Sequence, residues 1–270
     1  MKRDNGGVMK ILKKSGTIGL ILCMTMGVVA CSKSNDNTNK ETVTLNISAA
    51  ASLQEAMVEL ETKFKEIEPN VKLEINLGAS GALQQQIEEG APCDVFISAG
   101  EKQMTALADK DLLLEDTNKT LITNDLVLVA PEEIEIKNLE TLVTDNIEKI
   151  AIGDPQSVPA GKYAKEVLDN TKLYDKVENK LVLAKDVKEV LSWVRQGNAQ
   201  AGFVYLSDAQ GVEGIQVVYI TEADTHSPIN YPIAVLKSSK KQDKAKAFED
   251  LLLSDDGQAI LEKYGFKKAN

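Results

Sequence analysis

The chain has 270 residues, of which 41 are acidic and 31 basic, and its formal net charge is −10. This acidic balance argues against nucleic acid as a partner, because phosphate backbones bind surfaces rich in Lys and Arg. The single histidine, His226, excludes a histidine-rich metal site, and the length suffices for one large domain or two lobes.

Residues 1–30 are predicted to be a lipoprotein signal peptide. Five basic residues lie within the first fourteen positions, and an apolar run too short to span a bilayer follows from 17 to 30. The run ends in VVAC at 28–31, which resembles a bacterial lipobox, so Cys31 is the predicted lipidation site. An ordinary signal peptide that contains a cysteine by chance is the alternative. Met9 is a second candidate start, since residues 9–14 already form a basic region.

Residues 31–42 are predicted to be a flexible tether, because positions 32–42 are polar and contain no apolar residue. A lipid on Cys31 would hold the protein at the outer face of the cell membrane. Cys23 would leave with the signal peptide, and Cys93 would then be the only unmodified cysteine. No disulfide is therefore expected within the mature chain.

The next segment alternates strands and helices. The pattern predicts strands at 42–48, 71–77 and 94–98, and helices at 53–67 and 82–89. Strands separated by helices in this way favour right-handed crossovers and a largely parallel sheet.

The same pattern then restarts. Strands are predicted at 126–129, 149–152, 181–184, 201–205 and 231–236, and helices at 161–168, 187–195, 242–253 and 256–264. We interpret the chain as two α/β lobes with a ligand cleft between them. The first lobe is predicted to comprise residues 43–123 and 230–270, and the second residues 124–229.

Four of the predicted helices start shortly after a strand, around Ser52, Ser80, Ala160 and Val187, and a tight loop precedes the third. A helix start carries unpaired backbone N–H groups and a partial positive charge, so it binds anions without a cationic side chain. Ligands of α/β sheets lie beyond the carboxyl ends of the strands, where all four starts are expected. Together they would form a cage for a small oxyanion.

Each element also has an ordinary interpretation. Ser52 with Glu55, and Asp186 with Glu189, have the spacing of plain helix caps. Tyr205 ends a strand, where a buried phenol commonly bonds a stray carbonyl group.

A serine hydrolase is a remote alternative. Residues 78–82 (GASGA) nearly match the G-x-S-x-G nucleophile motif around Ser80, with Ala82 in place of the last glycine. The only candidate base is His226, in an apparent loop. No dinucleotide, Walker or H-E-x-x-H motif is present and no acid–base pair stands out, so we expect neither an enzyme nor a bound cofactor.

From about Thr42 to Phe266, the sequence resembles those of the molybdate-binding proteins of ABC importers. The motifs that carry the resemblance are AAASL at 49–53, SGAL at 80–83, GAPCDVFISA at 90–99, GDP with VPAG at 153–161, GFVY at 202–205 and SDDGQAIL at 254–261. Cys93 stands where alanine is frequent in that family, and we attach no function to it.

The resemblance implies a type II periplasmic-binding-protein fold whose lobes close on the ligand. Carried over by motif, the ligand-binding residues are Ser52, Ser80, Ala160, Val187 and Tyr205. The implied protein is a monomeric lipoprotein that captures molybdate and passes it to a membrane permease. Tungstate or sulfate binding by the same fold is the nearest alternative, because the residues beside Ser80 vary in the family. A sensor or adhesin that binds no small anion is a third class.

Overall fold

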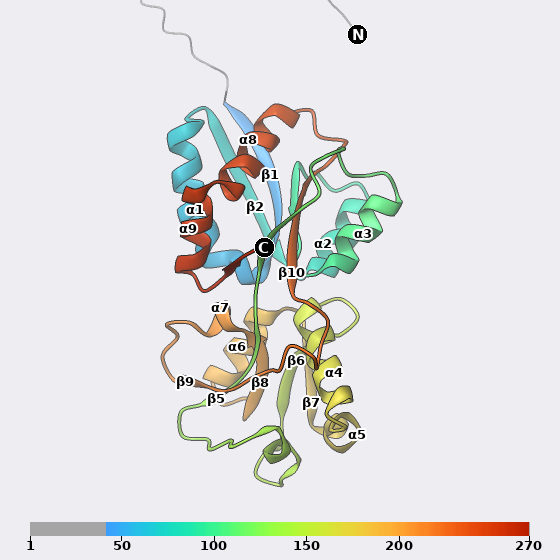
Figure 1. Cartoon of the computed structure of the whole chain (residues 1–270), viewed down its shortest axis with the longest axis vertical. Helices are drawn as coiled ribbons and strands as arrows, with labels where there is room; N and C mark the ends of the chain where they lie inside the picture. The colour runs from blue at the N-terminus through green and yellow to red at the C-terminus, as the bar shows by residue number, and fades with distance from the viewer. Residues whose placement is uncertain (1–41, 270) are drawn as a thin grey trace, which may run out of the picture. The chain divides into compact units, whose positions relative to one another are not determined.

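The computed structural model describes residues 42–269. Each of its two sheets belongs to one α/β lobe (Figure 1). The first sheet has the order β11-β4-β10-β3-β1-β2. Its strands are β1 (Val43–Ala50), β2 (Val71–Gly78), β3 (Val95–Ile97), β4 (Lys119–Thr123), β10 (Asn230–Val235) and β11 (Lys267–Lys268).

Helices cover both faces of this sheet. Because β2 and β3 lie on opposite sides of β1, right-handed crossovers place the two connecting helices on opposite faces. One group packs together on one face and a second group on the other (Figure 1). The first group contains α1 (Gln54–Ile67), α8 (Gln242–Leu253) and α9 (Asp255–Lys263), and the second contains α2 (Ser80–Glu88) and α3 (Glu101–Asp109).

The second sheet has the order β7-β6-β8-β5-β9. Its strands are β5 (Leu126–Pro131), β6 (Ile150–Gly153), β7 (Leu181–Ala184), β8 (Ala201–Tyr205) and β9 (Ile215–Ile220). The helices of this lobe are α4 (Pro159–Asn170), α5 (Tyr174–Val177), α6 (Val187–Arg195) and α7 (Leu206–Ala209). Three 3₁₀ turns complete the described elements: η1 (Ala51–Leu53), η2 (Leu139–Val143) and η3 (Glu178–Lys180).

The two-lobed α/β fold is confirmed, but the sheets are mixed rather than largely parallel. The strands that helices connect, β1 to β3 and β6 to β8, do pair in parallel. β10 runs antiparallel to β3 and β4, and β5 antiparallel to β8 and β9. These strands arrive from the other lobe or from a loop, and such connections permit antiparallel pairing without a helical crossover.

The sequence pattern did not predict six of the described helices and strands, namely α3, α5, α7, β4, β9 and β11. β9 is an edge strand that pairs only with β5 among the described strands, and its side chains are mostly half-buried or exposed. Two connections join the sheets, from Thr123 to Leu126 and from Ile220 to Asn230. Within residues 42–269, no helix has the length and apolar character needed to cross a membrane.

Candidate anion-binding site

Ser52 lies in the 3₁₀ turn η1, directly after β1, and is buried. The plain-cap interpretation of Ser52 and Glu55 is wrong, since no side chain caps η1 or α1. The Ser52 Oγ instead lies 2.9 Å from the hydroxyl oxygen of Tyr231. This serine therefore keeps its side chain for contacts other than the helix backbone.

Ser80 is the first residue of α2 and is also buried. Its Oγ accepts a hydrogen bond from the Ala99 N–H at 2.9 Å. A backbone N–H can only donate, so the Ser80 proton is free to point at another acceptor. His226 contacts the Ser227 carbonyl oxygen through Nδ1 and its ring is tilted against that of Tyr163, and the described residues show no hydrogen bond between His226 and Ser80.

Ala160 is the second residue of α4, after Pro159. Because proline has no N–H, Ala160 offers the first backbone donor of this helix, and helix geometry leaves that donor without an intrahelical partner. The start of α4 is held tightly against β6, since a Cβ at Gly161 would collide with the carbonyl oxygen of Gly153. This close packing fixes where the Ala160 N–H lies.

Val187 is the first residue of α6 and is buried. The predicted cap is confirmed: Asp186 Oδ1 accepts from the Glu189 N–H at 2.9 Å, and Glu189 Oε2 accepts from the Lys185 N–H at 2.7 Å. These bonds use other N–H groups, so that of Val187 remains available to a ligand.

Tyr205 is the last residue of β8, with a side chain that is 1% exposed. Its hydroxyl donates to the Ala99 carbonyl oxygen at 3.3 Å, so the ordinary interpretation of a phenol bonded to a carbonyl also holds in this structure. Burial raises the pKa of Tyr205 far above its usual value. The phenol therefore keeps its proton and remains a donor.

All five predicted residues line one small cavity of about 10 Å³ between the lobes. Residues from four helix starts line it, namely those of η1, α2, α4 and α6, which follow β1, β2, β6 and β7. The lining consists of Ala50, Ala51, Ser52, Gly78, Ala79, Ser80, Ala99, Val158, Pro159, Ala160, Asp186, Val187 and Tyr205. Asp186 carries the only charged side chain among them. The cavity thus combines neutral donors with helix N-termini, an arrangement that suits a small anion.

Direct contacts join the two lobes around this cavity. The Gly81 N–H donates to the Ser157 carbonyl oxygen at 2.9 Å. Lys188 of α6 lies 2.6 Å from Glu55 Oε2 of α1 and 2.9 Å from Asp208 Oδ1. Burial lowers the pKa of Lys188, but the Asp208 and Glu55 carboxylates outweigh that effect and raise it. The charge of this lysine is compensated within the protein, so it adds little to anion binding.

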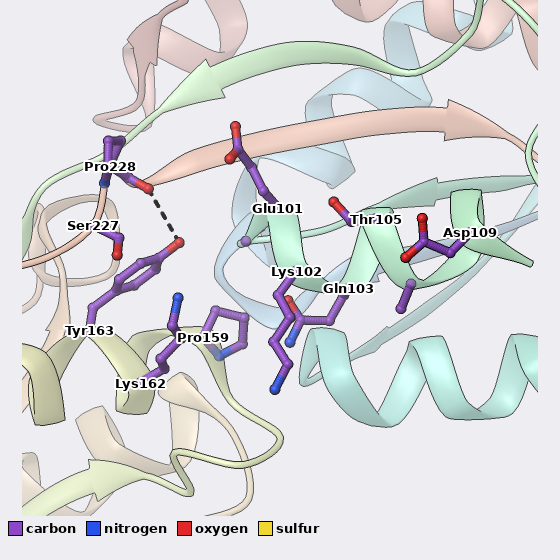
Figure 2. A pocket seen from close by; sticks show the side chains of 12 residues that line it. Glu101, Lys102, Gln103, Thr105, Asp109, Pro159, Lys162, Tyr163, Ser227 and Pro228 are labelled. Carbon is purple, nitrogen blue, oxygen red and sulfur yellow. Dashed lines mark hydrogen bonds between the residues drawn. The ribbon is translucent and has the colours of Figure 1, made fainter.

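A wider pocket of about 510 Å³ adjoins the cavity, with Pro159 lining both (Figure 2). It lies between α3 and α4, and Figure 2 shows charged side chains of both signs around it, among them Glu101, Asp109 and Lys162. The Tyr163 hydroxyl donates to the Pro228 carbonyl oxygen at 3.4 Å on one side. The acidic side chains of Glu101 and Asp109 make this pocket a weaker candidate for a small anion.

Sequence reasoning missed Tyr231 and Ala99, which contact Ser52, Ser80 and Tyr205. No local pattern could have indicated the first contact, because Tyr231 meets Ser52 across 179 positions of the chain.

Cys93 does not line the cavity. Cys31 and the predicted signal peptide lie outside the described residues. Cys93 is buried, and burial raises the pKa of its thiol to about 11, so the thiol is unreactive at neutral pH. In the part of the chain that the structure describes, no three His, Cys, Asp or Glu residues group as a metal site.

Comparison with known proteins places this geometry in a family. The model of the bacterial extracellular solute-binding proteins matches residues 45–267. YvgL of Bacillus subtilis, to which the role of an ABC-transporter substrate-binding lipoprotein is ascribed, is 42% identical over 88% of this chain and 92% of its own length. The molybdate-binding protein ModA of Haemophilus influenzae is 34% identical over 96% and 99%.

The fold of this chain is also similar to a solved structure. That structure is the substrate-binding domain ascribed to a molybdenum ABC transporter of Clostridium difficile, which matches this chain with a TM-score of 0.67 and 56% sequence identity. The similarity covers 84% of this chain and all of that domain. The chain belongs to the bacterial extracellular solute-binding proteins.

Proposed function

We propose that this protein captures molybdate outside the cytoplasm and delivers it to the membrane permease of an ABC importer. The observation that carries the proposal is a cavity lined by helix starts and hydroxyl groups, whose one charged side chain, Asp186, accepts a hydrogen bond from the backbone of its own helix. Two relatives support it, one named for molybdate and one ascribed to a molybdenum transporter. The ligand would be held by Ser52, Ser80, Ala160, Val187 and Tyr205.

Hydrogen-bond donors favour a fully ionised oxyanion. Such an ion offers only acceptors, and neutral donors bind it without the cost of burying a counter-charge. A protonated phosphate also needs an acceptor for its own hydrogen. The acceptor positions of Ser80 are partly used by the Ala99 N–H, so the site opposes a protonated ligand.

The proposal extends to the whole protein. Residues 43–123 with 230–270 form one lobe and residues 124–229 the other, and they close on the ligand as a monomer. A lipid on Cys31 anchors the protein to the outer face of the cell membrane, which agrees with the lipoprotein role ascribed to YvgL. The site performs no chemistry on the anion, and the ligand is its cargo rather than a cofactor.

A thermal-shift panel tests the ligand. Purified protein is heated with molybdate, tungstate, sulfate or phosphate. At a hundredfold excess over its dissociation constant, a ligand should add about 2.7 kcal/mol to the free energy of unfolding. We expect this stabilisation from molybdate and none from phosphate. Equal stabilisation by phosphate would contradict a site made of donors, and a larger shift with sulfate would change the assigned ligand.

A further inference from the structure

Tyr231 contacts the cavity from behind without lining it. It lies in β10, directly after the second connection between the lobes, and its side chain is fully buried. Its hydroxyl oxygen is 2.9 Å from Ser52 Oγ and 3.5 Å from Asn124 Nδ2, a long contact. Asn124 belongs to the first connection between the lobes, so this chain of polar groups links both connections to the site.

The Asn124 side chain determines which of these polar groups donates a hydrogen bond and which accepts it. The Asp125 N–H donates to Asn124 Oδ1 at 2.9 Å, so the other side of the amide must be the NH₂ group. That group can only donate, and it faces Tyr231 and the Ser207 Oγ, which is 2.8 Å away. Burial raises the pKa of Tyr231 far above its usual value, so its hydroxyl keeps a proton to give. Among the described residues, Ser52 Oγ is the acceptor that lies within 3.5 Å of this hydroxyl.

We infer that Tyr231 is a positioning residue that orients the Ser52 hydroxyl as a donor and so sets the preference for unprotonated oxyanions. This inference rests on the proposed anion site. With Tyr231 donating to Ser52, the serine proton points into the cavity. A ligand that turned a proton toward Ser52 would have to donate it to that hydroxyl. The serine would then turn its own proton toward Tyr231, and the buried phenol would lose its acceptor.

The cost of an unpaired buried hydroxyl predicts the size of the effect. Losing one acceptor of this kind corresponds to roughly a 5- to 100-fold change in affinity. Tyr231→Phe removes the hydroxyl that donates to Ser52. Ser52 can then accept a hydrogen bond from a protonated ligand, and no buried phenol is left without an acceptor. The ring contacts with Tyr205 and Phe266, at centroid distances of 5.6 and 5.5 Å, are retained.

The test compares dissociation constants for molybdate with and without excess phosphate, at a pH where phosphate carries a proton. For Tyr231→Phe we expect molybdate binding to weaken roughly 3- to 10-fold, the range for one hydrogen bond. We also expect phosphate to compete at least about fivefold better than in the wild type. Tyr219→Phe is the matched control, because Tyr219 lies in β9 outside the cavity lining.

A double-mutant cycle with Ser52→Ala separates positioning from mere structure. If Tyr231 acts through Ser52, adding Tyr231→Phe to Ser52→Ala should change the affinity for molybdate no further, and the affinity for phosphate no further either. Asn124→Asp gives a second route should Tyr231→Phe fold poorly. It replaces the donor to Tyr231 by an acceptor, and its added charge repels both anions, so only the phosphate-to-molybdate ratio is compared.

The outcomes distinguish the two proposals. A wild type that binds no molybdate overturns the proposed function and this inference together. A wild type that binds molybdate, with an unchanged anion ratio in both variants or with additive losses in the cycle, overturns the positioning role alone.

Discussion

At the residue scale, the hydroxyl groups of the site differ in what fixes their protons. Ser80 is fixed by a backbone N–H, which cannot reverse. Ser52 is paired with another hydroxyl, so its direction depends on the groups behind it. Tyr205 donates to Ala99 in this structure and would have to turn to reach a ligand. Selectivity thus depends on the partners of the donors as much as on the donors themselves.

Tyr205→Phe tests whether the phenol serves the ligand or the fold. The ring would keep its edge-on contact with Tyr231, and only the hydroxyl would be lost. If Tyr205 donates to the anion, molybdate binding should weaken by about 1.5–3 kcal/mol, the range for a bond to a charged group. The melting temperature of the ligand-free protein should barely change. Both quantities are measured on the same preparation, by calorimetric titration and by thermal unfolding.

The ordinary interpretation of Tyr205 predicts the reverse. If its main role is to satisfy the Ala99 carbonyl oxygen, the variant should melt at a lower temperature in the absence of ligand. Its affinity for molybdate should then equal that of the wild type. This pair of results would remove Tyr205 from the proposed site.

At the element scale, the sequence predicted which strands and helices exist better than how they meet. The site-forming helices α4 and α6 were predicted within two residues at each end, because apolar periodicity and the Asp186 cap are local signals. The mixed pairing of β10 was not predictable in this way, since its partners are β3 and β4, far apart in sequence. Tyr231 and Ser52 both belong to the first lobe, and their contact exists only once β10 has joined the sheet that contains β1.

Gly81 shows how closely two of these elements approach. It lies in the first turn of α2, and a Cβ built there would stand 2.5 Å from the carbonyl oxygen of Ser157 in the other lobe. Gly81→Ala should therefore hinder contact between the lobes and weaken molybdate binding by about 1–3 kcal/mol, the usual cost of overpacking. Titration calorimetry gives the affinity, and the neighbouring exposed variant Ala82→Ser is the control. Equal affinity of the two variants would show that the lobes bind ligand without this contact.

At the scale of the whole molecule, anchoring and binding are proposed to be separate. The described fold begins at residue 42, and the proposed lipid site at Cys31 lies before it. Cys31→Ser should release the protein from membranes into the soluble fraction while molybdate affinity stays unchanged. Fractionation of cells followed by immunoblotting measures the first effect, and titration of the purified variant the second. A variant that stays with the membranes would contradict lipid anchoring through Cys31.

The stability of the fold should also depend on pH through Glu249. This residue of α8 is 1% exposed, its Oε1 lies 3.9 Å from Lys119 Nζ, and that oxygen accepts no hydrogen bond from the described residues. Burial raises the pKa of its carboxyl group from 4.5 to about 7, and the Lys119 charge offsets only part of that rise. The folded state therefore holds this proton more tightly than the unfolded chain does.

Glu249→Gln should accordingly stabilise the protein at neutral pH and not in acid. A raised carboxyl pKa contributes stability that is complete below the unfolded pKa of 4.5 and lost as the pH rises through about 7. Glutamine carries no titrating proton, so relative to the wild type its free energy of unfolding should rise across that window, by on the order of 2–3 kcal/mol. Urea unfolding of the ligand-free proteins at a series of pH values measures this difference. Asp250→Asn, at an exposed position next in the helix, is the matched control. A difference between Glu249→Gln and wild type that stays constant with pH would show that Glu249 is ionised in the folded protein throughout, because only a proton held through that window can produce the slope.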